Sequence, residues 1–210
     1  MASGLKLPRL YAILDAGCFA PELSLTRLTD FARELVAGGV TLLQYRNKHS
    51  STREILSHLR ELKRALPPAV TLFLNDRADL CLAAGFDGVH VGQDDLSPAG
   101  ARLVVGEKKF VGVSTHNVEQ LQLADQAPVD YIALGPIFST RSKVNPDPVV
   151  GLDGLRAVRN LTNKPLVAIG GITRDNCRAV IDAGADSVAV IADLLGDPRL
   201  RAQEFLQRLA

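Results

Sequence analysis

Short apolar runs recur along the whole chain, and longer stretches with helical spacing separate them. Some runs are apolar on successive residues, as in Leu166-Val167-Ala168-Ile169. Such continuous runs are typical of parallel strands that are buried on both faces. The pattern predicts eight strands, which cover Leu10–Leu14, Thr41–Tyr45, Leu72–Asn75, Gly88–Val91, Phe110–Ser114, Tyr131–Gly135, Leu166–Ile169 and Ser187–Ile191.

Most of the intervening segments carry their apolar residues on one face of a helix. The clearest predicted helices are Thr26–Ala37, Ser51–Leu66, Thr173–Ala183 and Leu200–Leu209. Three connections from helix to strand share an Ala-Gly pair, and glycine there can end a helix in the left-handed conformation. Short connections of this kind are typical of consecutive βαβ units.

Alternating strands and helices leave two main architectures, a closed eight-stranded barrel and an open doubly wound sheet. Eight units in 210 residues favour the barrel. The chain has no GxGxxG after the first strand, so the dinucleotide-binding form of the open sheet has no support. We therefore predict an α/β protein with a single-domain (β/α)8 TIM barrel over residues 1–210, with its core at about 9–195 and a C-terminal helix at about 200–210.

Composition narrows the choice of partners. The chain has 24 basic and 23 acidic residues, a balance that favours neither nucleic acid nor an anionic membrane surface. The cysteines Cys18, Cys81 and Cys177 are scattered, so we expect reduced, buried thiols in a cytoplasmic protein. We expect no signal peptide in Met1–Leu10 and no membrane span. Small molecules are the expected partners, and the sequence leaves a homo-oligomer open.

Active sites of such barrels lie at the carboxyl ends of the strands, where this chain gathers charged residues. Gln44, Arg46 and Lys48 alternate in sequence, so an extended backbone points all three the same way. Arg and Lys side chains that converge suit a phosphate or diphosphate. A solvated strand end is the alternative, and Lys143, which follows the sixth strand, favours the anion site.

Asp76 and Asp95 follow neighbouring strands and predict a metal site. Two close carboxylates repel each other, and Mg²⁺ commonly binds one or two carboxylates together with substrate phosphate oxygens. Each aspartate could instead cap the helix that follows it. The pair beside the cationic residues favours a metal–diphosphate site. Asp94 competes with Asp95 as a ligand, and we prefer Asp95 mainly because of the resemblance described below.

Gly170-Gly171, followed by a helix expected near Thr173, predicts a phosphate site built from backbone amides. A simple tight turn remains the alternative. We expect His90 to be a packed or hydrogen-bonded structural residue, and His116 either to contact ligand or to start a helix. Two anion sites and a magnesium site suggest transfer between two phosphorylated small molecules, with a diphosphate as the leaving group.

Several strings of residues resemble the thiamine-phosphate synthase family, in the order in which that family carries them. The resemblance covers roughly residues 9 to 195. It rests on the residues 44–48 (Gln-Tyr-Arg-Asn-Lys), 75–77 (Asn-Asp-Arg), 88–95 (Gly-Val-His-Val-Gly-Gln-Asp-Asp), 135–138 (Gly-Pro-Ile-Phe) with Thr140, Ser142 and Lys143, and 168–172 (Ala-Ile-Gly-Gly-Ile).

The resemblance implies a transferase reaction. A hydroxymethylpyrimidine diphosphate loses pyrophosphate, and the ring nitrogen of a thiazole phosphate captures the resulting pyrimidine carbocation to give thiamine phosphate. It also implies that Gln44 contacts the pyrimidine and that Ser114 lies near the reacting atoms. The diphosphate would be held by Arg46, Lys48, Asn75 and Lys143, and Mg²⁺ by Asp76 and Asp95.

For the second substrate, the resemblance implies that Thr140 and Ser142 line the thiazole side. Backbone amides near Gly171, Ile191 and Ala192 would bind the thiazole phosphate. Two positions depart from the common pattern, because Ala192 replaces a frequent serine and Ser142 replaces a frequent threonine. A backbone contact at Ala192 would be unaffected by the first change, and the second keeps the hydroxyl.

Three other functions compete with the synthase. The related thiazole tautomerase carries a histidine where this chain has Pro136 and lacks the full diphosphate and metal set. Another phosphate-binding isomerase would need an acid–base pair but not Asp76 with Asp95. A non-catalytic barrel would be expected to lose the cluster of Arg46, Lys48 and Lys143, which is intact here.

Overall fold

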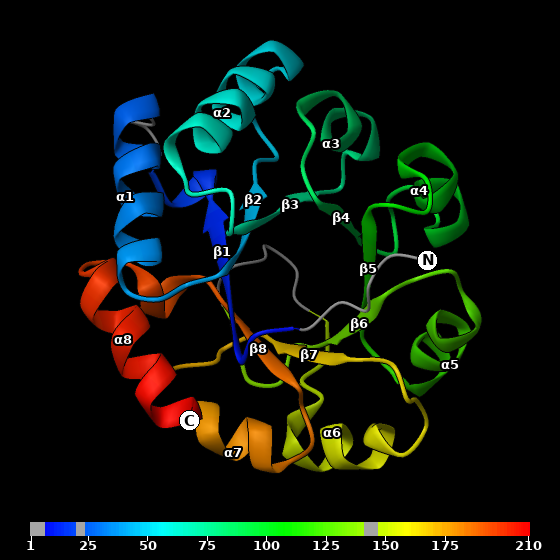
Figure 1. Ribbon diagram of the computed structural model, residues 1–210. Helices are drawn as coiled ribbons and strands as arrows, with labels where there is room; N and C mark the ends of the chain where they lie inside the picture. Colours follow the sequence, from blue (N-terminus) through cyan, green and yellow to red (C-terminus); the bar gives the residue numbers. More distant parts are fainter. Residues whose placement is uncertain (1–6, 20–23, 141–146) are drawn as a thin grey trace.

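Eight parallel strands close into a barrel in which each strand pairs with the next and β8 pairs with β1. The computed structural model describes residues 7–19, 24–140 and 147–210. Figure 1 looks along the barrel and shows the helices as an outer ring around the strands. The strands are β1 (Leu10–Asp15), β2 (Leu42–Arg46), β3 (Thr71–Asn75), β4 (Gly88–Val91), β5 (Phe110–Thr115), β6 (Tyr131–Leu134), β7 (Leu166–Ile169) and β8 (Ser187–Val190).

A helix follows each strand in the described parts of the chain. The α-helices are α1 (Leu25–Ala37), α2 (Thr52–Ala65), α3 (Ala78–Ala84), α4 (Pro98–Val105), α5 (Val118–Gln126), α6 (Gly151–Arg159), α7 (Cys177–Asp182) and α8 (Pro198–Leu209), with short 3₁₀ turns η1 (Ala16–Phe19) and η2 (Ala192–Leu194). The predicted α/β barrel is confirmed, and every strand agrees with its predicted bounds to within one residue.

Local sequence signals set several of the element ends. A capping box starts α2, in which the Ser51 side chain accepts from the Glu54 N–H and the Glu54 carboxylate accepts from the Ser51 N–H. Gly85 ends α3 in the left-handed conformation at φ 68°. Gly39 and Gly184, in the equivalent connections, also have positive φ. The repeated Ala-Gly signal therefore marks the turns that return the chain to the barrel.

One predicted helix starts too early. The prediction placed it at Thr173–Ala183, whereas α7 begins at Cys177. The Thr173 N–H donates to the side chain of Asn176 at 2.8 Å, and the Arg174 N–H donates to Asp193 Oδ2 at 2.8 Å. These side-chain acceptors hold residues 173–176 in a turn and delay the helix.

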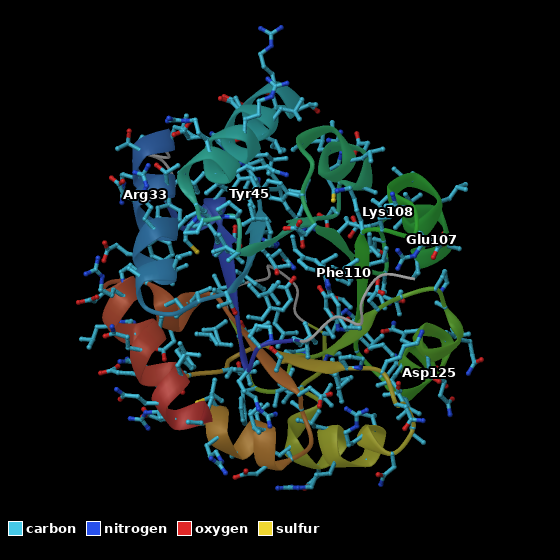
Figure 2. All side chains as sticks on the ribbon, in the orientation of Figure 1. Arg33, Tyr45, Glu107, Lys108, Phe110 and Asp125 are labelled. Atoms are coloured by element: carbon cyan, nitrogen blue, oxygen red, sulfur yellow. The ribbon has the colours of Figure 1, made fainter. Side chains whose placement is uncertain are left out.

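The core has two layers. One lies between the strands and the helices, and the other fills the barrel interior with Tyr11, Ile13, Leu42, Phe73, Tyr131, Ala133, Val167 and Ala189. Figure 2 shows Arg33 on the outer ring of helices and Phe110 inside it. Cys81 and Cys177 are buried as predicted, but Cys18 is exposed, so the prediction of three buried thiols is wrong there. Among the described helices, none has the length and apolar character that a membrane span needs.

Candidate active site

A cavity opens at the carboxyl ends of the strands and brings together most of the predicted site residues. Its lining includes the predicted Gln44, Arg46, Asn75, Ser114, Thr140, Gly171, Ile191 and Ala192. Lys48, Asp76 and Asp95 do not line it. Asp76 directly follows Asn75, which does, and Asp76 contacts both Lys48 and Asp95. Ser142 and Lys143 lie outside the described residues.

Arg46 is held by a carboxylate that the sequence prediction missed. Its Nη1 lies 2.5 Å from Asp15 Oδ2, and the two residues are register partners at the ends of β2 and β1. Asp15 Oδ1 also accepts from the Gly17 N–H at 3.0 Å. Asp15 is the last residue of its strand, and this position alone places it at the rim of the barrel. The same criterion, applied to the first strand, would have found it.

Asp76, Asp95 and Lys48 form a second charged group. Lys48 Nζ lies 3.1 Å from Asp76 Oδ2. Burial, and then the neighbouring carboxylate of Asp95, raise the pKa of Asp76 to about 6, although Lys48 opposes the shift. Asp95 Oδ2 accepts from the Gly92 N–H at 2.8 Å, which fixes the turn after β4. Two carboxylates are therefore held close together next to one cation.

Neither aspartate caps a helix, so the alternative explanation for both is wrong. The N-cap of α3 is Arg77, without a side-chain cap, and the N-cap of α4 is Ser97, whose Oγ accepts from the Gly100 N–H. Asp76 itself has φ 64°, and its N–H donates to His90 O at 2.8 Å. This left-handed conformation is rare for a non-glycine residue and holds the Asp76 backbone against β4.

The donor set fits a hard divalent cation that completes its coordination with water or ligand oxygens. The two neighbouring carboxylates repel each other, which contributes to the raised pKa of Asp76, and a bound cation would relieve this repulsion. Over the described ranges, the structure contains no group of three or more His, Cys, Asp or Glu side chains placed to hold a metal ion.

The glycine pair after β7 lies against the loop that follows β6. Gly170 and Gly171 have φ values of 100° and 63°. A Cβ on Gly171 would lie 2.5 Å from Ser139 O, and the Phe138 N–H donates to Gly170 O at 3.0 Å. The two loops therefore approach so closely that glycine is needed, which supports the tight-turn explanation of the motif. Gly171 also lines the cavity, so both explanations of this motif have support.

Fewer backbone amides are available for the predicted phosphate site than the sequence suggested. The Thr173 and Arg174 amides already have side-chain acceptors, so they cannot donate freely to a ligand. Arg174 Nε donates to Asp193 Oδ2 at 3.0 Å, which ties the loop after β7 to η2. Within the described chain, the Gly171 N–H has no hydrogen-bond acceptor. The candidates for binding phosphate therefore include this amide and the first amides of η2, starting at Ala192, and the Ile191 amide just before them stays a prediction.

Two histidines reach the cavity in different ways. His90 is 8% exposed, and both of its ring nitrogens are hydrogen bonded, in agreement with the prediction of a hydrogen-bonded residue. His116 Nδ1 donates to Gly135 O at 2.5 Å, and its Nε2 lies 3.4 Å from Asp147 Oδ2. His116, which lies between β5 and α5, thus connects the end of β5 to the segment that follows β6.

A closed (β/α)8 barrel with a cavity at the carboxyl ends of its strands, lined by both polar and apolar side chains, defines the class of TIM-barrel enzymes. The family model described as thiamine monophosphate synthase matches residues 10–194. The chain therefore belongs to the thiamine monophosphate synthase family, and it is a transferase.

Individual relatives agree with this assignment. The chain is 81% identical to a thiamine-phosphate synthase of Koribacter versatilis, over 100% of this chain and 99% of the relative. It is 45% identical to a thiamine-phosphate synthase of Chloroflexus aurantiacus, over 88% of this chain and 83% of the relative. The solved structure of a thiamine phosphate pyrophosphorylase from Pyrococcus furiosus superposes with a TM-score of 0.83 at 31% identity, covering 96% of this chain and 95% of that one.

Proposed function

We propose that the cavity joins 4-amino-2-methyl-5-hydroxymethylpyrimidine diphosphate to thiazole phosphate, giving thiamine phosphate and pyrophosphate. The bond between the pyrimidine methylene carbon and the diphosphate oxygen breaks, and its electron pair leaves with the diphosphate. The thiazole nitrogen then donates its lone pair to the pyrimidine carbocation and forms the new C–N bond. Departure of the leaving group precedes capture, so the substitution is dissociative.

The observation that carries this proposal is the charged rim, where Lys48 contacts Asp76 beside Asp95, and Arg46 ends β2, the strand that pairs with β3 before Asp76. We assign Asp76 and Asp95 to Mg²⁺. When bound, the ion would supply positive charge that stabilises the departing diphosphate. We assign Arg46, Lys48, Asn75 and Lys143 to the diphosphate.

Pre-positioning of the cations supports their assignment. Arg46 is fixed by Asp15 and Lys48 by Asp76, so neither side chain needs to be ordered when substrate binds. The planar guanidinium of Arg46 can use its remaining N–H groups for a phosphate oxygen pair. Stabilisation of charge on the leaving group is then the main contribution that these residues make to the rate.

The other end of the cavity is assigned to the second substrate. We infer that Thr140 and Ser142 contact the thiazole, and that amides near Gly171, Ile191 and Ala192 bind its phosphate. Gln44 contacts the pyrimidine: it lines the cavity and uses Nε2 for Tyr11, which leaves its Oε1 for ligand. Ser114 Oγ lies beside the reacting atoms.

A mixing assay tests the proposal. Purified protein is incubated with both substrates, with Mg²⁺ or with excess EDTA, and thiamine phosphate is read as thiochrome fluorescence. Product that requires Mg²⁺ supports the reaction and the metal. Product that is unchanged in EDTA would remove the metal role. No product from a folded protein that still binds thiazole phosphate would favour the tautomerase or a ligand-binding barrel.

Lys143→Ala gives a second test, with Lys108→Ala as its matched control. Lys108 precedes β5 and so lies at the opposite end of the barrel from the cavity. We expect the first variant to lower turnover by about 100-fold or more with the barrel intact, because a charge near the leaving group is lost. Equal turnover in the two variants would remove Lys143 from the diphosphate site.

A further inference from the structure

Five buried or partly buried polar side chains form a continuous hydrogen-bonded chain across the barrel interior. Gln44 Nε2 donates to Tyr11 Oη at 2.8 Å, Tyr11 Oη lies 3.0 Å from Tyr131 Oη, and Tyr131 Oη lies 2.8 Å from His90 Nδ1. His90 Nε2 lies 2.8 Å from Ser114 Oγ. Both ends of the chain line the cavity, whereas Tyr131 is 0% exposed and does not line it.

The link between Tyr131 and His90 depends on Gly112. Gly112 is the register partner of His90 on one side and of Tyr131 on the other, so β5 separates the two bonded residues. A Cβ on Gly112 would lie 2.0 Å from Tyr131 Cζ. The phenol ring therefore occupies the space that any other residue at position 112 would fill.

The Nε2 that Gln44 presents to Tyr11, together with the number of protons in the hydrogen-bonded chain, fixes its direction. Each phenol has one proton to donate, and a neutral imidazole has one donor and one acceptor nitrogen. Because Tyr11 accepts from Gln44, its own proton goes to Tyr131, and the Tyr131 proton goes to His90 Nδ1. His90 then carries its proton on Nε2 and donates it to Ser114 Oγ.

The opposite direction leaves a buried group unsatisfied. If His90 Nδ1 donated to Tyr131, then Tyr131 would donate to Tyr11, which already accepts from Gln44. With Gln44 presenting Nε2, the Tyr11 proton would then have no acceptor among the described residues, and an unsatisfied buried donor is costly. Burial raises the pKa values of Tyr11 and Tyr131 far above the ordinary range, so both phenols keep their protons.

We propose that Tyr131 and His90 are positioning residues that set the direction of the Ser114 hydroxyl. Because Ser114 Oγ accepts from His90, its own proton is left to point into the cavity. Ser114 then offers a donor to an acceptor atom of the substrate, a ring nitrogen or a diphosphate oxygen. The identity of that substrate rests on the proposed function, but the direction of the chain does not.

The first test is the tautomer of His90 in the wild-type protein without substrate. Nitrogen-15 NMR of the histidine rings distinguishes a proton on Nε2 from one on Nδ1, and a His90→Gln variant identifies the signals of this residue. We expect Nε2–H as the dominant form. Dominant Nδ1–H would overturn the proposal, whether or not the protein makes thiamine phosphate.

The second test is Tyr131→Phe, which removes the donor to His90 Nδ1 and keeps the aromatic packing against Phe73. We expect a mixture of His90 tautomers and a fall in kcat of about tenfold, the effect of losing one hydrogen bond in the transition state. The KM for thiazole phosphate should stay the same, because that ligand binds at the other end of the cavity.

Tyr45→Phe is the matched control, because Tyr45 Oη makes a similar hydrogen bond of 2.6 Å to His58 Nδ1, and neither residue belongs to the hydrogen-bonded chain from Gln44 to Ser114. It should leave the His90 tautomer unchanged. If the wild-type protein makes product and Tyr131→Phe changes neither the tautomer nor kcat, the inference is overturned and the proposed function stands. A wild-type protein that makes no product would reject the proposed function, and the tautomer would still decide the inference.

Discussion

Asp15 and Arg46 form an ion pair of 2.5 Å between the last residues of two neighbouring strands, although 31 positions separate them in the sequence. The Asp15 side chain is 8% exposed and the Arg46 side chain 20%. The ion pair is therefore mostly buried at the carboxyl ends of β1 and β2 and does not lie on the outer surface. Its carboxylate sets the direction in which the guanidinium presents its free N–H groups.

The ion pair predicts a stability difference between two aspartates. Asp15→Asn should lower the free energy of unfolding by about 1–3 kcal/mol, because it leaves a partly buried guanidinium without its charged partner. Asp30→Asn is the control, since Asp30 and Arg33 form an exposed pair that should contribute under about 0.5 kcal/mol. Urea unfolding measures both, and equal values would show that the burial of the Asp15–Arg46 pair has no consequence.

The geometry of Arg46 also predicts that lysine cannot replace it. Arg46→Lys keeps the charge but loses the planar fork that can bond Asp15 and a phosphate together. We expect kcat/KM for the pyrimidine diphosphate to fall about tenfold or more. The same change at Arg33, on the outer face of α1, should have no effect. Kinetics that match wild type in Arg46→Lys would mean that only a point charge is needed there.

The raised pKa of Asp76 predicts how proton and metal compete. Since the pKa is about 6 in the folded protein and near 3.8 ordinarily, the folded state binds more protons between these values. The stability of the metal-free protein should therefore fall as pH rises through about 4 to 6. Affinity for Mg²⁺ should fall as pH drops below about 6, because a protonated carboxyl is a poor ligand.

Thermal unfolding with and without Mg²⁺ across this pH range checks both trends. Asp76→Asn should remove them, whereas Asp153→Asn, which changes a fully solvated carboxylate on α6, should not. The range from about pH 5 to about pH 7 brackets the Asp76 pKa. If the Mg²⁺ affinity of the wild-type protein stays constant over this range, Asp76 is not a metal ligand.

Gly112 predicts a coupled pair of substitutions. Gly112→Ala should destabilise the protein by about 1–3 kcal/mol, because the new methyl group overlaps the Tyr131 ring. In a protein that already carries Tyr131→Ala, the same change should cost less, since the ring is gone. A double-mutant cycle of unfolding free energies measures this coupling. Additive effects would show that the two side chains do not compete for space.

Much of the barrel could be predicted from the sequence because its signals are local. Runs such as Leu166–Ile169 are apolar on both faces, and Ala-Gly pairs mark the returns from helix to strand, so the strands agree with the prediction to within a residue. Parallel strands align their carboxyl ends at one rim. For that reason Gln44, Arg46, Asn75 and Ser114 could be placed at the cavity before any contact was known.

The tertiary structure decided which of these groups are partners. Asp15 meets Arg46, and Tyr131 meets both Tyr11 and His90, only because the barrel closes in one register and Gly112 leaves a gap between β4 and β6. The delayed start of α7 has the same origin, since the Arg174 N–H donates to Asp193 in η2, the turn that follows the next strand. Periodicity records whether a residue is buried, but hydrogen bonds between distant residues depend on atomic positions that only the closed barrel defines.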